Sequence, residues 1–394
     1  MGTITFLLVL SFLVFFHELG HFLAARYFGV KVHVFSIGFG KQLFAKEWKG
    51  TTWQFALIPL GGYVKIAGMI DESMDKEQME KPPEPHEFRS KKAWKRLIIM
   101  IGGVVVNLIL GFLIYMMVLA VWGRDYVEAG GVKHGFSATE FFEGFGFQDG
   151  DQVQSVNGEE MFSVTDVSRH LLMRDVATVE VIHPGETEVT MLEMPEDIGM
   201  QMWVNGEETG LSHRIFPIIA VDPNEPDRGA FKAGMETGDK ITAIDGTPIT
   251  YWDEMATALK GKKDIDVTVD LEREGKPMTL TVRTDTAARL GVGADESATE
   301  GILDIQHKDY SFGEAIAGGW NFGYWTLHDY VVQFKYVFTK KGATGVGGFG
   351  MIASMFEPEW NWHKFWMNTA LISIILAFMN LLPIPALDGG HVLF

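Results

Sequence analysis

Two histidines and a glutamate near the start of the chain have the spacing of a metal-binding motif. Residues 17–21 read H-E-L-G-H. In a helix, side chains four positions apart lie on the same face, so both imidazoles can bind one metal ion. The glutamate between them can then act as a general base toward an attacking water molecule. We therefore expect His17 and His21 to be metal ligands and Glu18 to be the catalytic base.

A catalytic metal site of this kind needs a third protein ligand. The chain has no cysteine, which leaves His, Asp or Glu and also excludes a disulfide scaffold and a thiol nucleophile. Asp388 follows a long apolar run, and we expect it to complete the site. Pro383 and Pro385 must break the preceding helix, and the broken backbone can turn this carboxylate toward the metal. His391 is the alternative third ligand.

Three apolar runs predict a membrane protein. Residues 97–123 and 365–387 contain no charged side chain, and residues 1–25 contain only Glu18. Each run is long enough to cross the bilayer core, which needs roughly 20 apolar residues. The first run lacks the basic start and the cleavage site of a signal peptide, so we expect a retained helix.

The distribution of charge predicts the orientation of these runs. Residues 26–96 carry 13 basic and 8 acidic side chains, whereas residues 124–310 carry 16 basic and 37 acidic ones. Because short basic loops stay in the cytoplasm, we place 26–96 there and 124–310 on the opposite side. The net charge of −18 also argues against nucleic acid as a partner.

The segments between the apolar runs differ in composition. Residues 27–69 contain short apolar stretches punctuated by glycine, which predicts a small β-region on the cytoplasmic side. Residues 70–96 are charged and contain prolines, which predicts a loop. Residues 309–364 are rich in aromatic side chains, which predicts an interfacial amphipathic helix and a linker.

The acidic region contains an internal repeat. Residues 146–158 read GFQDGDQVQSVNG and residues 234–246 read GMETGDKITAIDG. The repeat indicates two tandem domains, 124–209 and 210–308. The motif alone predicts only a strand that ends in an Asn/Asp-Gly turn. In its context each copy resembles a PDZ domain, a β-rich α+β fold that binds extended peptides at a sheet edge.

A second motif surrounds Asp388. Residues 380–389 read N-L-L-P-I-P-A-L-D-G. Together with an H-E-x-x-H motif in an apolar run and the tandem PDZ-like repeats, this sequence resembles the site-2 proteases, which are intramembrane zinc metalloproteases. The resemblance covers nearly the whole chain. It implies a Zn²⁺ cofactor held by His17, His21 and Asp388, with Glu18 activating the water.

The same resemblance implies how a substrate binds. Asn380 is implied to lie beside the substrate. The β-element implied to pair with an unwound substrate segment consists of Gly61, Gly62, Tyr63, Val64 and Lys65. The implied substrates are single-pass membrane proteins such as an anti-sigma factor, cut during an envelope stress response, and also remnant signal peptides. The implied location is the bacterial inner membrane, with the PDZ pair facing the periplasm.

The chain departs from the family pattern at two places. Near the second apolar run the family has G-P-x-x-N, whereas residues 103–107 read G-V-V-V-N and lack the proline. The resemblance also implies a fourth membrane helix after the L-D-G motif, and such a helix would lie beyond Phe394.

The predicted fold is therefore a polytopic α-helical membrane protein with a small membrane-associated β-element and two tandem PDZ domains. Its membrane helices are expected at 1–26, 97–123 and 365–394. The expected function is intramembrane peptide-bond hydrolysis. The alternative is a non-catalytic, membrane-anchored PDZ scaffold that binds envelope polypeptides. Residues 17–21 would otherwise be a hydrogen-bonded buried cluster or the proton relay of a transporter, although no inverted repeat supports a transporter.

Overall fold

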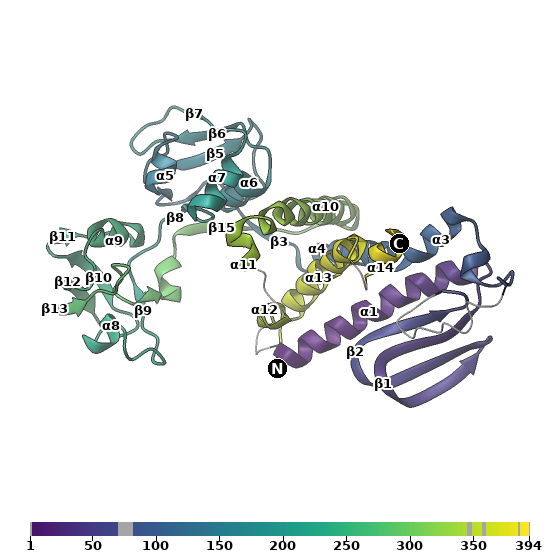
Figure 1. Ribbon diagram of the computed structural model, residues 1–394. Coiled ribbons are helices and arrows are strands. Elements are labelled where there is room, and N and C mark those ends of the chain that lie inside the picture. Colours follow the sequence, from purple (N-terminus) through teal and green to yellow (C-terminus); the bar gives the residue numbers. More distant parts are fainter. Residues whose placement is uncertain (1, 70–81, 345–348, 357–359, 385–386, 394) are drawn as a thin grey trace. The chain divides into compact units, whose positions relative to one another are not determined.

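The computed structural model describes residues 2–69, 82–344, 349–356, 360–384 and 387–393. The chain divides into two compact units (Figure 1). The first unit combines Met1–Arg124 with Asp309–Phe394, and the second is Asp125–Lys308. The predicted helical fold class is correct only for the first unit, and the chain as a whole is not mostly helical. The second unit is built mainly from short strands, as the alternating apolar pattern of its repeats requires.

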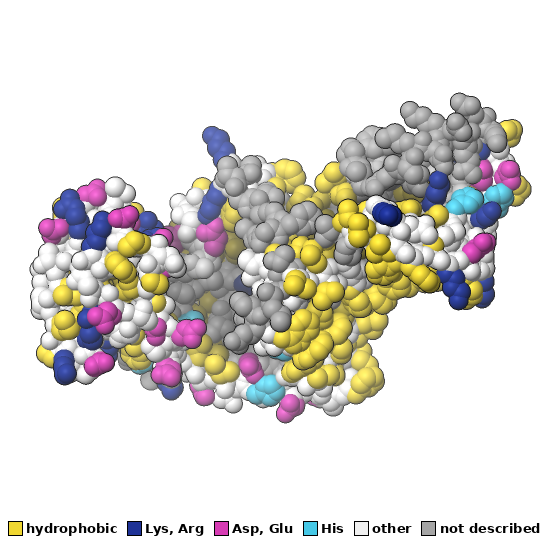
Figure 2. Space-filling model, turned by 90° about the horizontal axis from the view of Figure 1, so that it is seen from below, with side chains coloured by type: hydrophobic (Ala, Val, Ile, Leu, Met, Phe, Trp, Pro, Cys, Tyr) yellow, Lys and Arg dark blue, Asp and Glu magenta, His cyan; other side chains and the backbone are white. Residues whose placement is uncertain are grey.

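Among the described residues of the first unit, three helices are long and apolar enough to cross a membrane, which confirms the prediction of a membrane protein. They are α1 (Gly2–Tyr27), α4 (Gly102–Trp122) and α13 (Trp362–Leu381). Large apolar side chains remain exposed along them, for example Ile109 and Leu113 of α4. Figure 2 shows a wide hydrophobic patch over the part of the chain that contains α1, whereas charges of both signs are scattered over the second half of the other unit.

The second apolar run is not one continuous helix, contrary to the prediction. It is divided into α3 (Ala93–Met100) and α4, with Ile101 between them. At this break Gly102 touches Gly20 of α1, so closely that a Cβ atom on Gly20 would collide with the Gly102 carbonyl. Only glycine permits such an approach of two backbones. The break therefore lies where α1 and α4 meet, one turn from His17 and beside His21.

A two-stranded antiparallel sheet follows α1, in the stretch for which a small β-region was predicted. Its strands are β1 (Val32–Trp48) and β2 (Thr51–Ile66). Each of the two strands contains a bend, so that both ends of β2 lie beside the first part of β1. Ser36 of β1 therefore pairs with Tyr63 on one side and with Gln54 on the other. Phe35 is buried against α1 and stacks on Trp53, so the sheet is fixed to the helix that carries the histidines.

The long helix α10 (Phe312–Val337) occupies the aromatic-rich segment. Gly319 packs against Met116 of α4, and Gly323 packs against Phe112, so small residues let the two helices approach each other. Its predicted position at the membrane interface stays a prediction. The remaining helical elements of this unit are η1 (Phe88–Ser90), α11 (Lys340–Thr344), α12 (Phe349–Ser354) and α14 (Asp388–Leu393).

The second unit contains two halves of similar construction. The first half has the sheet β5-β6-β7 and the pair β4-β8. Its elements are β4 (Phe136–Ala138), α5 (Glu140–Glu143), β5 (Gln152–Val156), η2 (Val164–Asp166), α6 (Val167–Met173), β6 (Thr178–Ile182), β7 (Thr190–Glu193), α7 (Ile198–Asn205) and β8 (Leu211–His213).

The second half has the sheet β11-β10-β12-β13 and the pair β14-β9. Its elements are β9 (Ile219–Ala220), α8 (Gly229–Lys232), β10 (Lys240–Ile244), β11 (Thr247–Pro248), α9 (Trp252–Leu259), β12 (Asp266–Arg273), β13 (Lys276–Arg283), β14 (Gly293–Ala294) and η3 (Glu296–Thr299). The strands β3 (Arg124–Val132) and β15 (Leu303–Lys308) pair with each other.

The sequence repeat is also a repeat of backbone conformation. Asn157 and Asp245 both have a positive φ, of 54° and 47°, and each is followed by a glycine of positive φ. Their side-chain oxygens accept backbone hydrogen bonds from the next strand, at Thr178 in one copy and Thr268 in the other. The repeated Asn/Asp-Gly pair therefore specifies the same strand-ending turn twice.

Candidate active site

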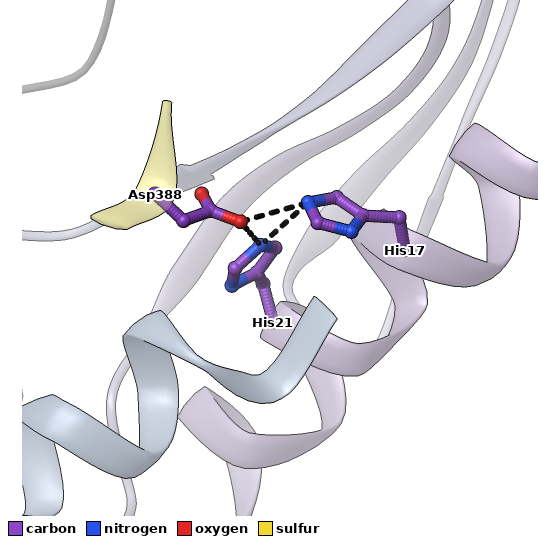
Figure 3. A group of neighbouring side chains, drawn as sticks. All are labelled: His17, His21 and Asp388. Carbon is purple, nitrogen blue, oxygen red and sulfur yellow. Dashed lines mark hydrogen bonds and ion pairs between the residues drawn. The ribbon is translucent and has the colours of Figure 1, made fainter. Parts of the chain in front are cut away.

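The expected metal ligands come from two elements that are far apart in the sequence. α1 carries His17 and His21 one turn apart, and α14 carries Asp388 at its first position. Figure 3 shows the two imidazoles and the carboxylate pointing toward one another. Asp388 Oδ2 lies 2.9 Å from His17 Nε2 and 3.3 Å from His21 Nε2. The two Nε2 atoms are 3.2 Å apart.

The hydrogen bonding of His21 determines which of its nitrogens faces the centre of the cluster. Its Nδ1 lies 2.8 Å from the carbonyl oxygen of Ile99, which can only accept, so Nδ1 carries the proton. In the neutral ring, Nε2 then directs a lone pair toward Asp388. Asp388 Oδ2 is itself buried, and the Nε2 atoms of His17 and His21 lie within 2.9 and 3.3 Å of it.

This donor set fits a cation. Protonating both rings would place two like charges 3.2 Å apart in a buried site, and protonating one ring would leave the other lone pair without a partner. A metal ion shared by the three atoms satisfies all of them together. Ligand atoms in tetrahedral zinc sites lie roughly 3.3 Å apart, given Zn–N distances of about 2.0–2.1 Å. Two of the distances observed here, 3.2 and 3.3 Å, match that spacing, and the third, 2.9 Å between His17 Nε2 and Asp388 Oδ2, is somewhat shorter.

The site is closed from behind by α4. His17 and His21 are only 8% and 7% exposed. A Cβ atom on Gly103 would come within 2.5 Å of His21 Nε2 and within 2.6 Å of His17 Cε1, so the glycine is needed for the rings to fit. Gly103 did not emerge from the sequence as a site residue, although the missing proline of the G-V-V-V-N segment drew attention to this turn.

A cavity of about 330 Å³ opens beside the cluster. The predicted residues that line it are His17, Glu18, His21, Gly61, Gly62, Tyr63, Val64, Asn380 and Asp388. Lys65 is absent from the described lining. The lining also contains apolar side chains that the sequence analysis did not single out, among them Val14, Phe39 and Leu376. Their signal was weak, because an apolar residue in an apolar run has no distinguishing pattern.

Glu18 and Asn380 border the cavity from two helices. A Cβ atom on Gly62 would lie 3.4 Å from Glu18 Cγ, so the glutamate stem passes directly over the β2 backbone. Asn380, in the last turn of α13, has its Nδ2 3.5 Å from His17 Nε2, which is at the limit of a hydrogen bond. His391 lies in α14, but its side chain is outside the part of the structure that is described.

The cavity also borders a sheet edge. Residues 62–66 of β2 pair with residues 32–37 of β1, from Gly62 opposite Ile37 to Ile66 opposite Val32. Within the described residues, no further strand pairs with the other side of this segment. An edge of this kind presents backbone N–H and C=O groups that another extended chain can use.

Several known proteins are similar to this chain over almost its whole length. The chain is 30% identical over 413 residues to a Neisseria meningitidis serogroup A protein named "Putative zinc metalloprotease", with 99% of this chain and 89% of that protein covered. It is 29% identical over 419 residues to the "Regulator of sigma-E protease RseP" of Escherichia coli K12, with the same coverage. The model of peptidase family M50 matches residues 5–394. The chain belongs to peptidase family M50.

Proposed function

We propose that this protein is a zinc metalloprotease that hydrolyses peptide bonds within the membrane-spanning segments of other proteins. The observation that carries the proposal is the cluster of His17, His21 and Asp388, in which two buried imidazoles and a carboxylate bring three potential ligand atoms within 3.3 Å of one another. The two histidines lie on α1, which is long and apolar enough to cross a membrane, where a structural role for such groups would be costly. The family and the zinc metalloprotease relative support the same cofactor.

Each residue of the site has a distinct part in this proposal. His17, His21 and Asp388 would hold Zn²⁺, which when bound supplies Lewis acidity for water activation and for polarising a peptide carbonyl. Glu18 lines the same cavity and would take the proton of the attacking water, then deliver it to the leaving amine. Asn380 would orient the substrate backbone through its amide.

The β2 edge at Gly61–Lys65 would hold the substrate in an extended form. A helical substrate hides its peptide bonds in internal hydrogen bonds, so cleavage requires local unwinding. Pairing with residues 62–66 would replace the lost bonds. The adjacent glycines keep the edge open, because a Cβ on Gly62 would approach Glu18 and the Ser36 carbonyl. Lys65 would contribute backbone groups, in keeping with its absence from the described lining.

The proposed substrates are single-pass membrane proteins of the anti-sigma factor type, with remnant signal peptides as a second class. Two relatives named as sigma-E regulators, from Escherichia coli and Salmonella typhimurium, support the first class. We place the protein in a bacterial inner membrane with Asp125–Lys308 on the periplasmic side. The excess of acidic side chains in residues 124–310 supports this orientation.

The two halves of Asp125–Lys308 are proposed to be PDZ domains, at 124–209 and 210–308. A cavity of about 500 Å³ in the second half supports peptide binding there. Its floor includes Met255 and Leu259 of α9, and Lys260 and Arg289 border it, a combination suited to a peptide that ends in a carboxylate. The pair would select trimmed substrates, either by excluding bulky ones or by binding the new C-terminus.

The test of the proposed function replaces Glu18 with glutamine, which removes the base and keeps the size. Glu18→Gln should bind one zinc per chain but cut a model transmembrane substrate roughly 10²–10⁴-fold more slowly. The exposed Glu143→Gln variant is the matched control and should cleave normally. Cleavage should also stop in a zinc chelator and return on adding zinc. Full turnover by Glu18→Gln would remove Glu18 from its role, and a wild-type protein without stoichiometric zinc would favour the scaffold alternative.

A further inference from the structure

One face of α4 lies directly against the two imidazoles. Gly103 and Asn107 are four positions apart and therefore share this face. Gly103 has no side chain, and a Cβ atom there would meet both rings. Asn107, one turn further along, is fully buried and reaches the ring of His17. The only polar side chain on this face of α4 thus ends at one of the proposed zinc ligands.

In the side-chain amide of Asn107, one polar atom has a hydrogen-bond partner and the other has none among the described residues. Its Nδ2 lies 3.4 Å from His17 Nδ1, whereas its Oδ1 is buried and has no hydrogen-bond partner among the described residues. The oxygen and nitrogen of an amide are assigned from hydrogen bonding, so the two orientations are interchangeable. Turning the amide by 180° places Oδ1 against His17 Nδ1. A buried unsatisfied carbonyl costs about 1–3 kcal/mol, which favours the turned orientation when the ring offers a proton.

We propose that Asn107 is a positioning residue for the metal site: its Oδ1 accepts a hydrogen bond from Nδ1–H of His17. This bond fixes the tautomer of His17, so that Nε2 presents its lone pair toward Asp388. The inference rests on the proposed function, because it assumes that His17 binds zinc through Nε2. It adds a residue on a third helix to a site otherwise made from α1 and α14.

The other imidazole has the equivalent support from the backbone. His21 Nδ1 donates to the Ile99 carbonyl at 2.8 Å, just before the break between α3 and α4. Metal-binding histidines regularly donate their second ring N–H to such an acceptor, and the acceptor raises ligand basicity. In this proposal each ring donates a hydrogen bond from Nδ1–H to an acceptor. Only the acceptor of His17 is a side chain, so only that acceptor can be removed by substitution.

Asn107 is itself held in place by α13. The hydroxyl of Ser373, which is fully buried, donates to the Asn107 backbone carbonyl at 2.7 Å. α13 ends at Leu381, a few residues before Asp388. α4 therefore contacts His17 on one side and, on the other side, the helix that leads to the aspartate. This placement suits a residue that holds the proposed zinc ligands His17 and Asp388 in a fixed position relative to each other.

The experiment compares two replacements of Asn107 in the full chain, with zinc affinity measured by competition against a chelator. Asn107→Leu keeps the size but removes the acceptor, and should weaken zinc binding about 10–100-fold. Asn107→Asp keeps an acceptor and should stay within about threefold of the wild type, as carboxylate–histidine–zinc triads do. Tyr115→Phe is the matched control on α4, because it removes a buried hydroxyl that bonds Thr326, away from the rings.

The outcomes separate this inference from the proposed function. A wild-type protein that binds no zinc overturns the proposed function itself. Zinc affinity unchanged in Asn107→Leu, or equally weak in Asn107→Leu and Asn107→Asp, overturns the role of the acceptor. If Asn107→Leu does not fold, nuclear magnetic resonance of ¹⁵N-histidine in the zinc-loaded wild type decides. We expect His17 with Nδ1 protonated and Nε2 bound to zinc, and the opposite tautomer would overturn the inference.

Discussion

Each of the two units largely shields one aspartate from solvent, with Asp239 1% and the Asp388 side chain 20% exposed, and the two carboxylates face different kinds of group. Asp239, in the second half of Asp125–Lys308, receives two hydrogen bonds from Arg273, at 2.7 and 2.8 Å, and one from the backbone N–H of Glu236. Asp388, in the first unit, has no arginine or backbone N–H at its Oδ2 among the described residues and faces two imidazole nitrogens there, at 2.9 and 3.3 Å.

The difference separates a structural carboxylate from one that we propose to be functional. Every oxygen of Asp239 is satisfied by a donor, so the group stabilises the turn of the repeat and needs nothing more. In the proposed site, Asp388 and the Nε2 atoms of His17 and His21 would direct lone pairs at one point, where a cation would satisfy all three. Burial is therefore a poor guide to function, whereas the kind of atom that faces a buried carboxylate is a good one.

The largest expected effect comes from removing the charge of Asp388. Asp388→Asn should reduce bound zinc from about one ion per chain to almost none, because a neutral amide is a weak zinc ligand. Cleavage of a transmembrane substrate should fall below detection, while the helices stay folded. Zinc analysis, a cleavage assay and circular dichroism measure the three quantities. Normal zinc content in Asp388→Asn would break the comparison, since the carboxylate would then be structural as well.

A smaller effect, of a different kind, is expected for Asp239. Asp239→Asn removes the buried ion-pair partner of Arg273, which then keeps only the exposed Glu236 carboxylate, and should lower the free energy of unfolding of Asp125–Lys308 by about 2–3 kcal/mol. The value lies at the lower end for a buried pair because the Arg273 side chain remains 22% exposed. Proteolysis in increasing urea measures the change.

Zinc content and cleavage should be unaffected by Asp239→Asn, which is the sharpest contrast with Asp388→Asn. The control is Asp266→Asn, where the partner is Arg283 at 3.3 Å and both side chains are more than 60% exposed. An exposed pair of this kind contributes little. An Asp239→Asn protein as stable as this control would show that burial of the ion pair has no consequence.

The smallest effect compares Asp239 with its counterpart in the first repeat. Burial raises the pKa of the Asp151 carboxyl, although His183 bonds to it at 2.7 Å. At Asp239 burial acts in the same direction, but the hydrogen bonds and charge of Arg273 outweigh it and lower the pKa. Ionised Asp239 therefore stabilises the fold above its unfolded pKa of about 3.9, and this contribution is lost as the pH falls through the lower, folded value.

The sign is opposite for Asp151, whose ionised form is unfavourable above its raised pKa, and that penalty disappears on acidification. The backbone N–H of Glu236 bonds Asp239, and that of Gln148 bonds Asp151. When the pH is lowered from neutral to 3, the Glu236 amide should lose protection from hydrogen exchange relative to the Gln148 amide. The ratio of the two amides' protection factors should change by less than about tenfold. A ratio that does not change with pH, or one that changes equally in Asp239→Asn, would contradict the assignment.

Much of the candidate site could be predicted because its signals are local. The H-E-x-x-H spacing places His17 and His21 on one helix face by helix geometry alone. Asp388 could be inferred from its position after an apolar run broken by prolines. The second apolar run was predicted less well, because nothing local indicates that α3 and α4 separate at Ile101. That break arises where Gly20 and Gly102 bring two helices into contact.

The repeat in Asp125–Lys308 also shows that local features can be predicted from the sequence, whereas contacts between distant residues cannot. Its Asn/Asp-Gly turns were readable from the sequence, since those residues tolerate the positive φ that the turns require. The partner of each buried aspartate was not, because His183 and Arg273 lie more than 30 positions away from the carboxylates that they bond. A contact between distant strands has no spacing rule that a sequence can reveal.

The sequence by itself indicated which residues are candidates for the chemistry and which segments are apolar enough to cross a membrane, because residue type and helical spacing are local properties of the chain. Only the tertiary structure decided that Asp388 meets the two histidines, that Gly103 makes room for them, and that the amide of Asn107 ends at His17. Those facts depend on three helices packing against one another. Packing of this kind follows from shape and unsatisfied hydrogen-bonding groups, which no single segment contains.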